Sequence, residues 1–211
     1  MLGPRTFTPL EQDFFDELAT LFVNLACLTA AVESFTTPES ITIPHNKDHW
    51  LRLTGRVAHV DFPTNSLMHF VVRNQWPEEL QFVFHPGTLN SVSPPSSVEL
   101  KSEAIATLIT QKVGVMFLKY YERNANRAKQ AYGTSPKIWP ETWRFGWVLR
   151  NAIAHGDKWA IDDLNFPETI WHSVKITSAD SGKPWYHPRH FIGGGDVILL
   201  MEEMDASINN P

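Results

Sequence analysis

The stretch "ETWRFGWVLRNAIAHG", residues 141–156, joins an apolar helical pattern to a polar end. Pro140 precedes it and suits the first turn of a helix, where an N–H group would have no partner in any case. The apolar positions follow helical spacing and are Trp143, Phe145, Trp147, Val148 and Leu149. Gly156 can adopt the left-handed conformation that ends many helices. We therefore predict a helix over residues 140–155 whose last turn is polar.

Three polar side chains occupy the end of this predicted helix. With about 3.6 residues per turn, Asn151 and His155 share a face, and Arg150 is long enough to reach them. The free carbonyl groups of the last turn favour a protonated imidazole, which suits proton transfer. An arginine can hold a phosphodiester through two N–H groups and stabilise the charge of the transition state. This set suits RNA cleavage without a metal ion, in which a ribose 2′-OH attacks the adjacent phosphorus.

The segment "RNAIAH", residues 150–155, resembles the motif of the HEPN superfamily, an arginine and a histidine separated by four residues, with asparagine often next to the arginine. The resemblance implies a small α-helical bundle. It also implies an endoribonuclease of the toxin–antitoxin or defence type, with Arg150, Asn151 and His155 as the catalytic set. Such domains usually form homodimers with a composite active site, and a cognate antitoxin or inhibitor is then a candidate partner.

Other interpretations of the same residues remain open. Arg150 could form an ion pair with Asp157 or Asp162, and His155 could simply cap the helix. Asn151 could hydrogen-bond to a helix carbonyl. At the level of function, the alternatives are a non-catalytic HEPN-like module that binds RNA, a nucleotide or a protein, and a helical interaction protein whose motif is accidental.

Composition limits the class of protein. The chain has 211 residues, of which 43% are hydrophobic, so we predict a single folded domain over residues 1–211. The net charge of −5 excludes a protein that binds nucleic acid through an overall positive field. The single cysteine, Cys27, fits a reducing compartment, and we expect a cytoplasmic protein. The apolar run over residues 18–32 follows acidic residues and is short for a bilayer, so we expect no membrane contact.

Three further helices are predicted. The first covers residues 8–33 and begins with a capping box formed by Thr8 and Glu11. The second covers residues 98–132 and is closed by Gly133. The third is the C-terminal helix, with Asp196 as its N-cap.

Residues 36–97 form a proline-rich segment that is harder to assign. We predict short helices near residues 47–60 and 67–75, and "ELQFVFHPG", residues 79–87, could equally be a strand. Alternating β-branched and aromatic residues predict a β-hairpin within residues 158–178. With the resemblance, these elements predict a mainly α fold, a HEPN-like antiparallel bundle with a small β-hairpin between the motif helix and the C-terminal helix.

A few basic residues outside the motif could contact RNA. They are Arg123, Arg127, Lys129 and Arg189. A solvated helix end explains the first three equally well. His187 and His190 flank Pro188 with no third ligand nearby in the sequence, which favours a surface loop over a zinc site. We therefore predict neither a metal ion nor a cofactor.

Overall fold

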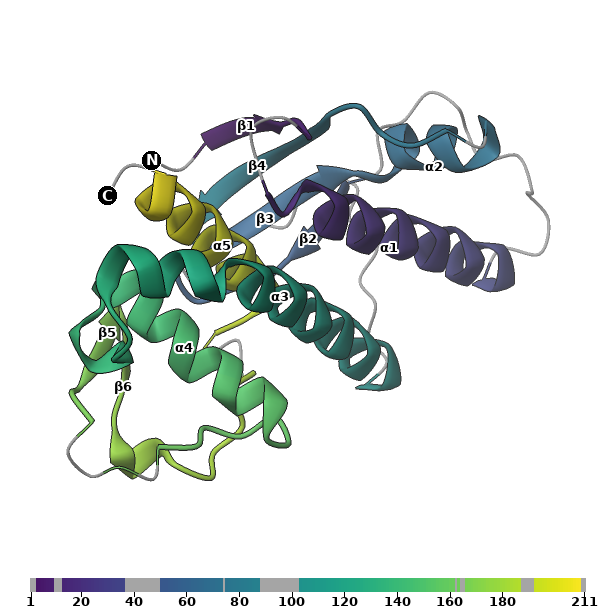
Figure 1. Cartoon of the computed structure of the whole chain (residues 1–211). Helices are drawn as coiled ribbons and strands as arrows, with labels where there is room; N and C mark the ends of the chain where they lie inside the picture. Colours follow the sequence, from purple (N-terminus) through teal and green to yellow (C-terminus); the bar gives the residue numbers. More distant parts are fainter. Residues whose placement is uncertain are drawn as a thin grey trace.

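The structure is a computed structural model, and it describes residues 3–9, 13–36, 50–73, 75–87, 103–161, 163, 166–186 and 192–209. The described strands are β1 (Gly3–Phe7), β2 (Trp50–Leu53), β3 (Ala58–Pro63), β4 (Leu80–Pro86), β5 (Thr169–Trp171) and β6 (Val174–Ile176). The described helices are α1 (Phe15–Thr36), α2 (Thr64–Arg73), α3 (Glu103–Tyr132), α4 (Glu141–Ala154) and α5 (Gly194–Asn209). Two short 3-10 helices, Pro136–Ile138 and Ser178–Asp180, lie in the connections (Figure 1).

A four-stranded antiparallel sheet forms one side of the molecule, in the order β1-β4-β3-β2 (Figure 1). In its register Phe7 lies opposite Leu80, and Val60 lies opposite Phe84. The mainly α prediction is therefore wrong, and the fold is mixed, with a sheet built from the N-terminus and from the proline-rich segment. The second sheet is the hairpin β5-β6, which lies within the predicted residues 158–178.

Two prolines of the proline-rich segment lie at strand ends, where they are compatible with a sheet. Pro63 is the last residue of β3 and Pro86 the last of β4, where a missing N–H group interrupts no ladder. The predicted helix near residues 47–60 is wrong, since β2 and the start of β3 occupy it. The helix predicted near 67–75 corresponds to α2, and the strand alternative for 79–87 is confirmed by β4.

Helix boundaries follow the sequence signals unevenly. Gly133 and Gly156 have φ of +89° and +90°, so both predicted helix stops are confirmed. The capping box at Thr8 is wrong, because α1 begins at Phe15 after strand β1. Asp196 is not the N-cap of the last helix, since α5 begins at Gly194 and Asp196 lies in its first turn.

The helices pack on one face of the sheet. In Figure 1, α5 lies between the sheet and the pair α3 and α4, and α5 contacts β2 and β3 as well as both of these helices. On α1, the ring of Phe22 stacks on Phe62 of β3 at a centroid distance of 4.1 Å. Trp143 of α4 is fully buried and donates its indole N–H to the carbonyl of Met204 at 3.0 Å. The buried apolar residues of sheet and helices form one cluster, which holds α4 in a fixed position.

A buried carboxylate joins the start of α5 to the turn between β2 and β3. Asp196 is fully buried and accepts backbone N–H bonds from Arg56 (2.6 Å), Val57 (2.7 Å), Ala58 (2.8 Å) and Gly193 (2.9 Å). Burial raises the pKa of this carboxyl group, and the four backbone donors oppose the rise. The backbone comes so close that a Cβ at Gly195 would lie 2.5 Å from the carbonyl oxygen of Ala58.

We predict that Asp196→Ala is strongly destabilising, by about 3–5 kcal/mol, because it leaves buried backbone N–H groups without acceptors. Asp180→Ala is the matched control, since Asp180 also accepts a backbone N–H, that of Thr177, but is only partly buried. That variant should lose about 0.5–2 kcal/mol. Denaturant unfolding measures both values, and equal losses would contradict the role given to Asp196.

A second buried carboxylate makes stability depend on pH. Burial, reinforced by the charge of Asp13 and opposed by Arg127, raises the pKa of Asp205 on α5 to about 6. The folded protein therefore keeps this proton between about pH 4 and about pH 6, where the unfolded chain releases it. The free energy of unfolding accordingly falls as the pH rises through this window.

Asp205→Asn should remove this contribution. We expect the variant to be more stable than the wild type by about 1–3 kcal/mol at pH 7 and equal to it near pH 3.5. Thermal unfolding across this pH range measures the difference. A constant difference between the two proteins at every pH would contradict the assignment to Asp205.

Candidate active site at the end of α4

Arg150 lies just before the last turn of α4 and contacts α3. Its Nε donates to Oε1 of Glu122 at 2.6 Å, and its Nη2 lies 2.6 Å from the same oxygen. Its Nη1 donates to Oδ1 of Asn151 at 3.2 Å. The ion pair expected with Asp157 or Asp162 is not the one observed: Asp157 accepts from Trp185, and Asp162 lies outside the described residues.

Asn151 connects the arginine to the histidine. Its side-chain oxygen accepts from Arg150, and its backbone carbonyl accepts the N–H of His155 at 3.0 Å. Within the described part of the chain, the Asn151 side chain makes no hydrogen bond to a helix carbonyl, so that alternative is not supported. The structure thus joins the side chains of Arg150 and Asn151, whereas His155 is joined to Asn151 through the backbone alone.

His155 is the C-cap residue of α4, with φ of −114° and ψ of 38°. It caps the helix through its backbone N–H, and its side chain is exposed. Within the part of the chain that the structure describes, the imidazole makes no hydrogen bond or ion pair. An exposed imidazole with both nitrogens accessible can take or deliver a proton.

The turn after the motif holds His155 at the surface. Gly156 and Asp157 both have positive φ, +90° and +61°, so the chain turns away sharply from the helix axis. Positive φ is unfavourable for a residue with a Cβ, and two hydrogen bonds hold Asp157 in this conformation. Oδ1 of Asp157 accepts the indole N–H of the buried Trp185 at 2.8 Å, and its carbonyl accepts the Trp185 backbone N–H at 3.2 Å.

Two of the basic residues considered for RNA contact pair with carboxylates outside the motif. Arg123 pairs with Glu17 of α1 at 2.6 Å. Arg127 pairs with Asp13 and donates to Asn124 and Asn209. Lys129 lies exposed in the last turn of α3, and Arg189 lies outside the described residues. The two arginines therefore tie α3 to neighbouring parts of the fold.

Glu122 is the site residue that the sequence did not indicate. Its neighbour Tyr121 is buried and packs on Trp143 of α4 with ring centroids 5.8 Å apart, which fixes α3 against α4. Glu122 then meets Arg150 across the two helices. No local pattern marks it, because the contact joins residues 28 positions apart in the sequence.

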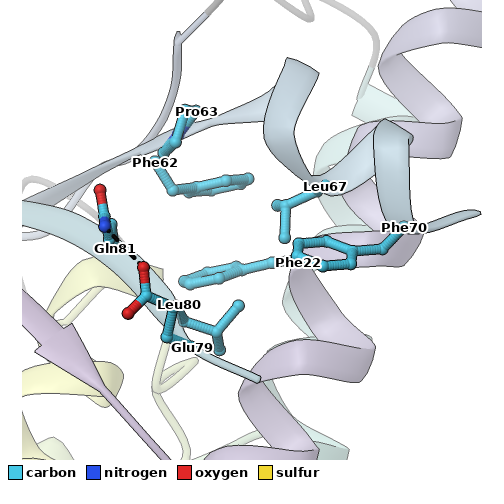
Figure 2. A pocket seen from close by; sticks show the side chains of 8 residues that line it. All are labelled: Phe22, Phe62, Pro63, Leu67, Phe70, Glu79, Leu80 and Gln81. Atoms are coloured by element: carbon cyan, nitrogen blue, oxygen red, sulfur yellow. Dashed lines mark hydrogen bonds between the residues drawn. The ribbon is translucent and has the colours of Figure 1, made fainter. Parts of the chain in front are cut away.

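An apolar pocket lies elsewhere in the fold. Its lining residues come from α1, α2 and the sheet region and are Phe22, Phe62, Pro63, Leu67, Phe70, Glu79, Leu80 and Gln81. Figure 2 shows the stacked rings of Phe22 and Phe62 on its wall and the hydrogen bond from Gln81 to Glu79 at its edge. None of these residues belongs to α3 or α4, so the pocket is separate from the motif.

The described residues contain neither a metal-binding group of side chains nor a helix that could span a membrane. No three His, Cys, Asp or Glu side chains of the described chain are grouped so that they could hold a metal ion. Among the described helices, none combines the length and the apolar character needed to cross a bilayer.

Comparisons with protein-family models, with curated proteins and with solved structures found no match for this chain. The helical bundle that the motif resemblance implies is also not the observed fold. Function is therefore inferred from the residues at the end of α4 and from their contacts.

The turn geometry gives a prediction for Trp185. Trp185→Phe should cost about 1.5–3 kcal/mol of stability, because it removes a hydrogen bond to a carboxylate. It should also speed hydrogen exchange at the backbone N–H of His155. The matched control is Trp171→Phe, which loses a similar hydrogen bond at 2.7 Å, from Trp171 of β5 to Glu203 of α5. Equal exchange at His155 in both variants would contradict a role for Trp185 in holding the motif.

Proposed function

We propose that this protein is an endoribonuclease that cleaves RNA through attack of the ribose 2′-OH, without a metal ion in the reaction. The observation that carries the proposal is the arrangement at the end of α4. There, the partly exposed guanidinium of Arg150 donates to the side chain of Asn151, and His155 ends the helix about one turn later with its side chain exposed. The motif resemblance supports the same function for these three residues.

The two charged side chains have different parts in the proposed reaction. His155 takes the proton from the 2′-OH, whose oxygen then bonds to phosphorus as the bond to the 5′-oxygen breaks. Arg150 binds the non-bridging phosphate oxygens and stabilises the negative charge that increases in the transition state. The products are a 2′,3′-cyclic phosphate and a 5′-hydroxyl end.

A second copy of the chain completes the proposed site. The leaving 5′-oxygen needs a proton, and one imidazole cannot accept and donate a proton at the same moment. A symmetric dimer would bring a second His155 to the phosphate and resolve this conflict. Sedimentation measurements test this part, and a monomeric mass under cleavage conditions would contradict it.

The proposed substrate range is narrow. The chain has a net charge of −5, and Arg123 and Arg127 are neutralised by carboxylates. Few cations are then left to bind phosphates along an RNA strand, so non-specific binding is expected to be weak. A structured RNA, or a partner protein that supplies the binding energy, fits this charge distribution best.

The test is cleavage of a mixed RNA pool in the presence of EDTA, with analysis of the fragment ends. We expect cleavage by the wild type and a loss of about 10²- to 10⁴-fold in His155→Ala and Arg150→Ala, because a proton-transfer group and a charge-stabilising group are removed. His172→Ala is the matched control, since His172 is also exposed but lies in the β5-β6 hairpin and pairs with Glu203 of α5. It should cleave like the wild type.

A second candidate is a non-catalytic module that binds RNA or a nucleotide at the same place. The specific observation in its favour is the Glu122 carboxylate, which partly neutralises Arg150. Folded wild-type protein that binds RNA in an Arg150-dependent way without cleaving it would favour this candidate. Cleavage retained in both Arg150→Ala and His155→Ala would contradict both.

A further inference from the structure

The contacts of Arg150 divide its guanidinium into two edges. A guanidinium has five N–H donors in one plane. The N–H of Nε and one N–H of Nη2 point to the same side, and both nitrogens lie 2.6 Å from Oε1 of Glu122. One N–H of Nη1 points to Asn151 at 3.2 Å.

Two N–H groups remain without a contact among the described residues, one on each terminal nitrogen. Nη2 keeps the N–H that faces away from Nε, and Nη1 keeps one of its two N–H groups. Outward-facing N–H groups on the two terminal nitrogens are parallel, and their spacing matches two oxygens of one phosphate. The Arg150 side chain is 32% exposed, so the protein does not enclose it. The Glu122 contact therefore orients the guanidinium and leaves the phosphate-binding edge open.

The packing of α3 on α4 keeps Glu122 in place for this task. Buried Tyr121 lies against buried Trp143, so the register between the two helices is set by the core. Figure 1 shows α3 and α4 side by side, consistent with their contacts. A side chain fixed in this way loses less entropy when it binds a ligand than one that moves freely.

We propose that Glu122 is a positioning residue, which holds Arg150 so that its terminal edge receives one phosphodiester group. The inference rests on the proposed function and adds to it a residue on a different helix. A positioning role differs from an inhibitory role, in which Glu122 would compete with the phosphate for Arg150. Competition would require the Glu122 carboxylate to lie on the terminal edge, but it lies on the edge formed by Nε and Nη2.

The first experiment measures the orientation without any RNA. The Nε–H signal of Arg150, assigned with Arg150→Lys, should exchange slowly with water in the wild type because Glu122 accepts it. Exchange should become at least about tenfold faster in Glu122→Ala and intermediate in Glu122→Gln, which keeps a neutral acceptor. Glu141→Ala is the matched control, since Glu141 pairs with Arg144 at the other end of α4. Equal exchange in the wild type and Glu122→Ala overturns the inference.

The second experiment measures the consequence for RNA. A positioning role predicts that Glu122→Ala lowers the single-turnover cleavage rate by about 10- to 100-fold, as small misplacements of a reacting group do. Glu122→Gln should recover part of the rate, and Glu141→Ala should match the wild type. Binding of a labelled 2′-O-methyl oligonucleotide, which cannot be cleaved, should weaken in the same order.

The outcomes separate this inference from the proposed function. Arg150-dependent cleavage that is unchanged or faster in Glu122→Ala overturns the positioning role and leaves the nuclease in place. Oligonucleotide binding that depends on Arg150 and on Glu122, without cleavage, supports the positioning role and contradicts the nuclease. A wild type that neither cleaves RNA nor binds the oligonucleotide overturns both.

Discussion

The carboxylate of Asp196 is the interaction on which the rest of the structure depends. It collects backbone N–H groups from the turn between β2 and β3 and from the start of α5, and so fixes the last helix to the sheet. A carboxylate can serve several donors at once, whereas a backbone carbonyl has two lone pairs. Gly193 and Gly195 are required because a Cβ would lie 2.2 Å from the carbonyl oxygen of Thr54 at the first position and 2.5 Å from that of Ala58 at the second.

The position of the candidate site follows from α5. This helix contacts the sheet on one side and α3 and α4 on the other. A Cβ at Gly146 of α4 would lie 2.7 Å from the sulfur of Met204, so the two helices approach closely at this glycine. The hydrogen bond from Trp143 to Met204 then fixes the position of α4 along α5. The core thus determines where the polar end of α4 reaches the surface, and Glu122 of α3 meets Arg150 as a result.

The sequence allowed the ends of α3 and α4 to be predicted, because Gly133 and Gly156 act through local backbone geometry. It did not allow the sheet to be predicted. Strand β3 alternates Ala58, Val60 and Phe62 with His59 and Asp61, but this pattern covers only six residues and did not outweigh the helix predicted over residues 47–60. The strand β1 pairs with β4, which is more than seventy positions further along the chain. The motif could be found in the sequence because its residues are close together along the chain. Glu122 could not be found, because it lies 28 positions from Arg150.

A comparison with Arg52 shows why Arg150 is the arginine suited to a ligand. Arg52 donates from Nε and Nη2 to the two oxygens of buried Asp61 at 2.6 and 2.7 Å, and its side chain is 12% exposed. Such a pair is enclosed by the sheet and joins β2 to β3. Arg150 uses the same two nitrogens on a single oxygen of a carboxylate that is itself 53% exposed. The ion pair of Arg150 is thus much less enclosed than that of Arg52. Breaking an enclosed ion pair is costly, so the more exposed guanidinium of Arg150 is the one better suited to take a ligand.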